Sequence, residues 1–310
     1  MAKRKKVITA ITAILLVLSL IIVVIAACSL IPIVIETSDY QQLSSGGESA
    51  GGSDDFCSTD SVNFIDWDYL RSINSDVVAW VSVNGTNIDY PVVQSDDNYE
   101  YVNKNFWGGY SFAGCPFLDH RSSADGEHAL VYGHNLAGIG TMFSSIHDSY
   151  NQSSFDQLGT VHWSTPDVGT IDFTPVMAMK VSESYQPIQT FDFDLTIDEK
   201  TKALEELSQS QSVDETIADA SVNSVEEIAN TDVSAKGAGS SQHDADKASL
   251  LQQAKRDKLH RWLFSLLQDS SASSLNAESL INQSSRVVTL ASCSSDWAGQ
   301  PWRTLFVCVA

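Results

Sequence analysis

The sequence has little cysteine and little positive charge, and both shortages narrow the possible functions. Its 310 residues include 5 cysteines without any Cys-x-x-Cys pair, which excludes a disulfide-stapled scaffold and leaves a structural zinc site unsupported. Lys and Arg number 18 against 39 Asp and Glu, for a formal net charge of -21. So acidic a chain is repelled by phosphate backbones, which argues against a nucleic-acid-binding protein. The histidines are dispersed rather than spaced as metal ligands, so the sequence predicts no metal and no other cofactor.

The N-terminus carries a basic cluster followed by a long uncharged stretch. Lys3 to Lys6 precede residues 7–31, and these 25 uncharged residues exceed the roughly 20 that a helix needs to cross a bilayer. We therefore expect residues 1–35 to form a cytoplasmic basic tip and a single transmembrane anchor, with the rest of the chain outside the cell. The alternative of a cleaved signal peptide requires a shorter apolar region of about 7 to 15 residues. A lipoprotein processing site at Cys28 is a further alternative, although residues 30–35 continue apolar where a lipoprotein turns polar.

Composition divides the remaining chain into a linker, a folded domain and an insertion. Residues 36–60 are rich in Ser, Gly and Asp and predict a flexible linker. Residues 61–310 form the predicted folded domain, in a chain whose hydrophobic content of 43% is enough for a sizeable core. Within this domain, about residues 198–250 lack aromatic residues and are acidic, which predicts an exposed insertion, partly helical and partly disordered. Apolar residues recur at helical spacing from Leu250 to Leu267, so a packed helix is expected to resume there.

Short apolar runs separated by turn residues predict a mainly β fold. Asp60 or Ser61 is positioned to cap a short helix that runs to about Leu70. Two β-rich runs then flank Asn84-Gly85, which is the strongest local signal of a hairpin. More such runs follow, and the C-terminal residues provide two further strands. This number of strands, with few helices, suits a closed or nearly closed β-barrel.

Three polar residues at strand ends form the candidate catalytic site. Residues 287–293 predict a strand that ends on Cys293, and Arg303 begins the next apolar run. At the rim of a barrel, such an arginine can meet an oxyanion formed beside a cysteine thiolate. Another predicted strand, residues 129–134, ends on His134, and histidine is the usual acid–base partner of a catalytic cysteine. Each of the three alone is more often structural: a buried cysteine, a solvated arginine or a hydrogen-bonded histidine.

Taken together, these segments resemble the sortases, membrane-anchored cysteine transpeptidases of Gram-positive bacteria, and most closely those of class B. The matching segments are TLASC ending at Cys293, Arg303 ten positions later, YGHN around His134, TMF at 141–143, Trp80, IDYPVVQ at 88–94, DNYEYV at 97–102 and GCPFLDHR at 114–121. The similarity covers about residues 61–195 and 255–310. The motifs are dispersed, but they occur in the order that the family has.

The resemblance implies a fold, a reaction and roles for the candidate residues. The fold would be the sortase-type closed β-barrel of about eight strands with peripheral helices. Cys293 would attack the carbonyl of a Thr in a sorting signal of the LPxTG or NPxTN type and form a thioester. Arg303 would stabilise the oxyanion, and His134 would protonate the leaving amine. An amine of a peptidoglycan cross-bridge or of a pilin would then resolve the acyl-enzyme.

The resemblance also implies substrate contacts. Asn98, Val102 and Ser292 match positions that line the signal-binding groove in class B relatives. Two features depart from the family pattern: Ser292 stands where the family usually has Thr, and the acidic insertion lies in a connection that helps to shape the substrate groove. The sequence therefore leaves open which sorting signal is read, which amine accepts, and whether the product is an anchored protein or a pilus.

Two other functions are compatible with the residues alone. A membrane-tethered extracellular binding module could present its acidic face to a basic partner, with Cys293 inert. A hydrolytic cysteine peptidase could use the same three residues with water as the acceptor. The remaining cysteines are not expected to take part: Cys308 is predicted in the core, and an extracellular location would permit a disulfide between Cys57 and Cys115, which we do not predict.

Overall fold

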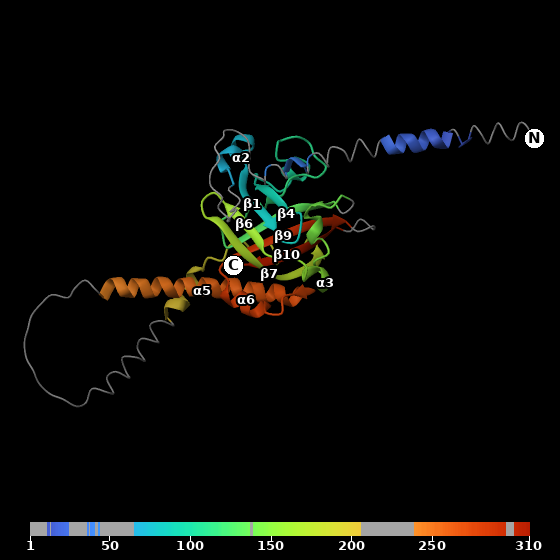
Figure 1. Cartoon of the computed structure of the whole chain (residues 1–310). Coiled ribbons are helices and arrows are strands. Elements are labelled where there is room, and N and C mark those ends of the chain that lie inside the picture. Colours follow the sequence, from blue (N-terminus) through green and yellow to red (C-terminus); the bar gives the residue numbers. More distant parts are fainter. Residues whose placement is uncertain are drawn as a thin grey trace, which may run out of the picture.

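The folded part of the chain is built around a single β-sheet, as a computed structural model shows (Figure 1). The structure describes residues 11–12, 14–24, 36, 38–40, 43, 65–136, 139–205, 239–295 and 301–310. The strands are β1 (Val77–Val83), β2 (Asp89–Val93), β3 (Phe117–Leu118), β4 (His128–Leu136), β5 (Thr141–Met142), β6 (Val161–Thr165), β7 (Gly169–Ser182), β8 (Ala272–Ser273), β9 (Val287–Ser295) and β10 (Pro301–Val309).

Eight of these strands form a closed ring. Their order is β10-β9-β4-β3-β2-β1-β6-β7, and β10 also pairs with β7, which closes the ring. The pairs β2–β3 and β4–β9 are parallel, and the other pairs in the ring are antiparallel. The short strands β5 and β8 pair with β4 and β7 outside the ring. The predicted closed β-barrel of about eight strands is therefore confirmed.

The predicted hairpin around Asn84-Gly85 is confirmed. β1 and β2 pair antiparallel, with Trp80 opposite Pro91. Gly85 adopts a φ of 83°, a conformation that glycine reaches without the steric cost of a Cβ. The Trp80 indole Nε1 donates to the Asp89 carboxylate at 2.7 Å, which ties the two strands together beyond their backbone pairing.

The helices lie outside the barrel. Those around the barrel include α2 (Trp67–Ile73), α3 (Gln152–Phe155), α5 (Gly239–Asp269), α6 (Ala277–Gln283) and the 3-10 helices η1 (Glu100–Val102) and η2 (Phe143–Ile146). In Figure 1, α5 and α6 lie along one side of the barrel next to β7, and α2 lies at the opposite end beside β1. The predicted arrangement of peripheral helices around a β-barrel is thus confirmed.

The first helix of the barrel domain begins later than predicted. Asp66 is the N-cap of α2, and its carboxylate accepts the backbone N–H of Tyr69 at 2.9 Å. This hydrogen bond satisfies one of the N–H groups that the first turn of a helix leaves unpaired, so it sets the start of the helix. Asp60 and Ser61, the predicted caps, lie outside the described residues.

The helix predicted over residues 250–267 is confirmed, and it extends further in the N-terminal direction, to Gly239. Leu259, Leu263 and Leu266 are buried, at the spacing of one helix face. The stripe predicted from the sequence is therefore the face that packs against the rest of the domain.

Several predicted segments lie partly or wholly outside the described residues. Within the predicted anchor, residues 14–24 are helical, and no helix among the described residues is both long and apolar enough to cross a membrane. Most of the predicted linker, including Cys57, and residues 206–238 of the predicted insertion lie outside the described ranges. The described flanks of that insertion, residues 197–205 and the start of α5, are helical.

The core is built from aromatic and aliphatic side chains. Its fully buried members include Trp163, Phe173, Phe306, Leu118 and Leu130. Cys308 is buried and free, as predicted, and Cys115 is a second buried free cysteine. Burial raises the pKa of both thiols, so neither forms the thiolate that a nucleophile needs.

Candidate active site

Three neighbouring strands bring the predicted catalytic residues into one row. β9 lies between β4 and β10 in the barrel. Cys293 on β9 pairs with His134 on the parallel strand β4 and with Arg303 on the antiparallel strand β10. Neighbouring strands lie about 4.8 Å apart, so these backbone positions are close in space although they are far apart in the chain. The row lies near the C-terminal ends of β4 and β9.

A pocket of about 470 Å³ opens at this row, a volume typical of sites that bind small ligands. The described residues that line it are Asn98, Tyr99, Val102, Cys115, Phe117, Arg121, Tyr132, Gly133, His134, Glu183, Gln189 and Arg303. His134 and Arg303 therefore share one pocket. In the part of the chain that the structure describes, no three His, Cys, Asp or Glu side chains are grouped as metal ligands.

A backbone carbonyl holds the ring of His134. Its Nε2 lies 2.7 Å from the carbonyl oxygen of Val102. A carbonyl oxygen only accepts, so Nε2 carries a proton and the neutral ring has its lone pair on Nδ1. Gly114 allows the chain to pass close to this carbonyl, because its φ is +64° and a Cβ there would lie 2.7 Å from the Val102 oxygen. The local chain path therefore determines which nitrogen of His134 can act as a base.

Arg303 lies between a carboxylate and an aromatic ring. Its Nη2 donates to Glu183 Oε1 at 3.1 Å, and its guanidinium carbon lies 4.8 Å from the centroid of the Tyr132 ring. The Arg303 side chain is 21% exposed, so it is partly desolvated. A guanidinium has five N–H donors, and among the residues that the structure describes Glu183 accepts from one of them, so other donors can meet a ligand in the pocket.

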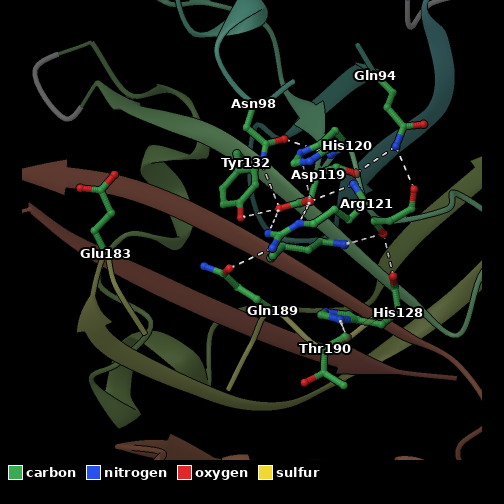
Figure 2. Close-up of polar contacts among 12 residues, drawn as sticks. Gln94, Asn98, Asp119, His120, Arg121, His128, Tyr132, Glu183, Gln189 and Thr190 are labelled. Carbon is green, nitrogen blue, oxygen red and sulfur yellow. Dashed lines mark hydrogen bonds and ion pairs between the residues drawn. The ribbon is translucent and has the colours of Figure 1, made fainter. Parts of the chain in front are cut away.

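A buried carboxylate, Asp119, binds several polar residues that line the pocket, and Figure 2 shows these contacts. The Asp119 side chain has no exposed surface, and it accepts hydrogen bonds from Nε and Nη2 of Arg121, each at 2.9 Å. It also accepts the Tyr132 hydroxyl and Asn98 Nδ2, each at 3.0 Å. Burial alone would raise the pKa of Asp119, but the hydrogen bonds from Arg121 and Tyr132 and the charge of Arg121 lower it to about 2. The carboxylate is therefore ionised near neutral pH and anchors three residues of the pocket wall.

The charges around the pocket are balanced in pairs. Asp119 neutralises Arg121, whose Nη1 also donates to Gln189 at 3.1 Å and whose guanidinium lies over the Phe191 ring. Glu183 neutralises Arg303. These four side chains leave no net charge at the site, although the chain as a whole is strongly acidic.

The three predicted substrate-contact residues differ in their placement. Asn98 and Val102 line the pocket. Both ends of the Asn98 amide are already used, because Nδ2 donates to Asp119 and Oδ1 accepts the backbone N–H of His120. Ser292 is fully buried, it does not line the pocket, and its hydroxyl has no hydrogen-bond partner among the described residues. Its placement does not support a substrate contact.

Eight of the residues that line the pocket were not predicted as site residues, among them Arg121, Tyr132, Glu183 and Gln189. Arg121 and Tyr132 belong to the GCPFLDHR and YGHN segments, so the resemblance marked their positions without assigning them a role. Glu183 and Gln189 follow β7 in a segment without a motif. They join the site only because β7 pairs with β10, next to Arg303.

His128 is expected to make the fold sensitive to mild acid. It is buried at the start of β4, with Nδ1 2.8 Å from the carbonyl of Thr190 and Nε2 3.0 Å from the Thr289 hydroxyl. Burial lowers its pKa from 6.5 to about 4. Because the unfolded chain takes up the proton first, the free energy of unfolding should fall by about 3 kcal/mol between pH 6.5 and pH 4.

Urea unfolding at a series of pH values would measure this loss. His128→Gln removes the titrating group, so the variant should be less stable at pH 7 but should lose less stability between pH 6.5 and pH 4. An unchanged pH dependence in His128→Gln would assign the acid sensitivity to other groups.

Comparison with known proteins identifies what this barrel and site are similar to. No family model matches the chain. Sortase B of Staphylococcus aureus is 33% identical over 90 residues, which are 28% of this chain and 36% of that protein. Sortase B of Listeria monocytogenes is 35% identical over 79 residues, 25% of this chain and 32% of that protein. The chain thus spans about a third of the length of the curated relatives that it matches.

Among solved structures, sortase B of Clostridium perfringens matches with a TM-score of 0.48 and 22% identity, over 78% of this chain and 97% of that one. The chain is similar to sortases. Both sequence relatives are sortases of class B. The predicted resemblance of this chain to class B sortases is therefore confirmed.

Proposed function

We propose that this protein is a cysteine transpeptidase of the class B sortase type, with Cys293 as nucleophile, His134 as acid and base, and Arg303 as oxyanion partner. The observation that carries the proposal is the row across β4, β9 and β10, in which Cys293 lies between the other two residues. The pocket shared by His134 and Arg303 gives a substrate carbonyl a place beside that row.

The first half of the proposed reaction starts from a Cys293 thiolate whose thiol proton has passed to Nδ1 of His134. The thiolate attacks the carbonyl carbon of the Thr in a sorting signal of the LPxTG or NPxTN type. The oxyanion that forms is stabilised by N–H donors of Arg303. The bond between the Thr carbonyl carbon and the next nitrogen then breaks, and His134 gives a proton to the departing amine. The product is a thioester between Cys293 and the shortened protein.

In the second half, an amine attacks the thioester, and the thiolate of Cys293 leaves. His134 takes the proton that the incoming amine loses, so the enzyme returns to its starting state. A thioester retains most of the activation of the bond, so the exchange needs no ATP. The acceptor in this proposal is an amine of a peptidoglycan cross-bridge or of a pilin.

The electrostatics of the site support a peptide substrate without charge at its core. Arg121 and Arg303 are matched by Asp119 and Glu183, so the pocket offers hydrogen-bond donors without a net charge. The uncharged run after Lys6 supports attachment to the cell membrane by an N-terminal helix, with the N-terminus in the cytoplasm and the barrel outside. In that location, surface proteins that bear sorting signals would be the partners.

Mass spectrometry of the full chain after incubation with a panel of LPxTG-type and NPxTN-type peptides would test the proposal. We expect an adduct on Cys293 with the mass of the peptide cleaved after Thr, and no adduct in Cys293→Ala. Triglycine or hydroxylamine should then release the acyl group as a ligated product. Release as free acid at the same rate, with or without an amine, would indicate a hydrolytic peptidase instead.

Thiol labelling distinguishes an enzyme from a binding module. A methanethiosulfonate reagent should modify Cys293 at neutral pH, and a sorting-signal peptide should slow this reaction. Cys308 serves as the internal control, because it is buried and its raised thiol pKa makes it unreactive. A Cys293 that resists the reagent in the folded protein would contradict its role as nucleophile.

A further inference from the structure

Tyr132, a residue of the pocket wall, connects a buried carboxylate to Arg303 in two steps. Tyr132 donates its hydroxyl to Asp119 Oδ2 at 3.0 Å. The ring of the same Tyr132 lies 4.8 Å from the guanidinium carbon of Arg303. Figure 2 shows Tyr132 with its hydroxyl directed at Asp119, and the Tyr132 side chain is itself buried. The Arg303 guanidinium therefore packs on a ring whose hydroxyl is hydrogen-bonded to Asp119.

Asp119 is a rigid anchor for that ring. It accepts five hydrogen bonds: from the backbone N–H, Nε and Nη2 of Arg121, from Asn98 Nδ2 and from the Tyr132 hydroxyl. Its pKa of about 2 keeps it ionised near neutral pH. Hydrogen bonds to an ionised carboxylate are roughly twice as strong as those between neutral groups. The Tyr132 hydroxyl is therefore held in one position.

The other contact of Arg303 holds it less firmly. Glu183 accepts one N–H of Arg303 at 3.1 Å, but the Glu183 side chain is 52% exposed. An ion pair with an exposed partner is weak and is screened by salt. Of the two contacts, the Tyr132 ring is the one with a fixed position. If the ring moved, the guanidinium could follow Glu183 away from the row.

We propose that Asp119 is a positioning residue that holds the Arg303 guanidinium over the pocket through the Tyr132 ring. This inference rests on the proposed function, in which Arg303 meets the oxyanion. A displacement of about 1 Å in such a group can slow a reaction by about 100-fold. Asp119 does not line the pocket, so it acts on the rate of acylation through the residues that it holds, of which Tyr132 is the one in contact with Arg303.

Tyr132→Phe is the sharpest test, since it keeps the ring and removes only the hydroxyl. We expect acyl-enzyme formation to slow about 10-fold with little change in KM, because the misplaced guanidinium affects the transition state more than the bound peptide. Asp119→Asn should slow the step by about 10- to 100-fold. The double variant should be no slower than Asp119→Asn, since both changes break the same link. Tyr69→Phe, at an exposed tyrosine of α2, is the matched control and should leave the rate unchanged.

Chemical labelling gives a readout that does not depend on catalysis. Phenylglyoxal modifies accessible arginines, and peptide mapping distinguishes Arg303 from Arg121. In Tyr132→Phe and Asp119→Asn, Arg303 should react several-fold faster than in the wild type. Arg286, which lies just before β9 with a side chain 17% exposed, should keep its rate and serves as the internal reference. A melting curve of each variant shows whether it is folded.

The two proposals can fail separately. If the wild type forms no acyl-enzyme with any sorting-signal peptide, the proposed function fails, and the labelling still shows whether Tyr132 and Asp119 hold Arg303. An unchanged labelling rate of Arg303 in folded Tyr132→Phe would overturn the positioning role. With an active wild type, effects that multiply in the double variant would overturn it as well.

Discussion

Replacing Arg303 by alanine is expected to slow acyl-enzyme formation by about 100- to 1,000-fold, which is the usual cost of removing one oxyanion donor. Arg303 lines the pocket one strand away from Cys293. Its ion pair is with Glu183, an exposed residue, so the loss should change the melting temperature little. The measurement is the rate of adduct formation on Cys293 by mass spectrometry, together with thermal unfolding.

Two further variants separate the charge of Arg303 from its shape. Arg303→Lys keeps the charge but lacks the planar fork of N–H donors, so it should recover only a small part of the activity. Glu183→Gln keeps the size of the counter-ion and removes its charge, and its effect should be much smaller than that of Arg303→Ala. Arg71→Ala, at an exposed arginine of α2, is the matched control. Adduct formation at the wild-type rate in Arg303→Ala would remove Arg303 from the site.

Replacing His134 by alanine is expected to slow turnover by about 100- to 10,000-fold, the range that general acid–base groups contribute. The reason lies in both halves of the proposed reaction, since the leaving amine needs a proton and the incoming amine must lose one. The carbonyl of Val102 fixes the proton on Nε2, so Nδ1 is the nitrogen available to exchange protons in the neutral ring.

The two halves can be measured apart. Single-turnover adduct formation reports the first half, and transfer from a preformed acyl-enzyme to triglycine reports the second. His134→Ala should slow both steps. His162→Ala is the matched control, because His162 lies on β6 and pairs with Asp172 instead of facing the pocket. If His134→Ala slowed neither step, another group would have to move the protons.

Much of the fold could be predicted from local patterns in the sequence. Alternating apolar runs and the Asn84-Gly85 turn predicted strands and a hairpin, because these depend on neighbouring residues along the chain. The helix after residue 250 was predicted from its apolar stripe, although its start at Gly239 was not. The start of α2 was predicted too early, since several polar residues precede it and only the Asp66 hydrogen bond shows which one caps the helix.

The candidate catalytic residues could be selected from the sequence because strand ends and the resemblance to sortases marked His134, Cys293 and Arg303. What the sequence could not supply is their common row, which depends on β9 pairing with β4 on one side and with β10 on the other. Such pairings join distant segments, and the periodicity of a strand does not say which neighbour it will have. For the same reason, the burial of Ser292 was not foreseen.

By itself, the sequence determined the class of fold, the likeness to class B sortases and the residues to examine, since these rest on short segments with a periodicity or a motif. Only the tertiary structure decided that Glu183 and Gln189 belong to the pocket and that Asp119 anchors Tyr132 beside Arg303. Closure of the barrel places β7 against β10. Folding also removes the Asp119 carboxylate from water, so hydrogen-bond donors of the protein must match its charge. Those donors come from three separate segments, so no local pattern in the chain could specify them.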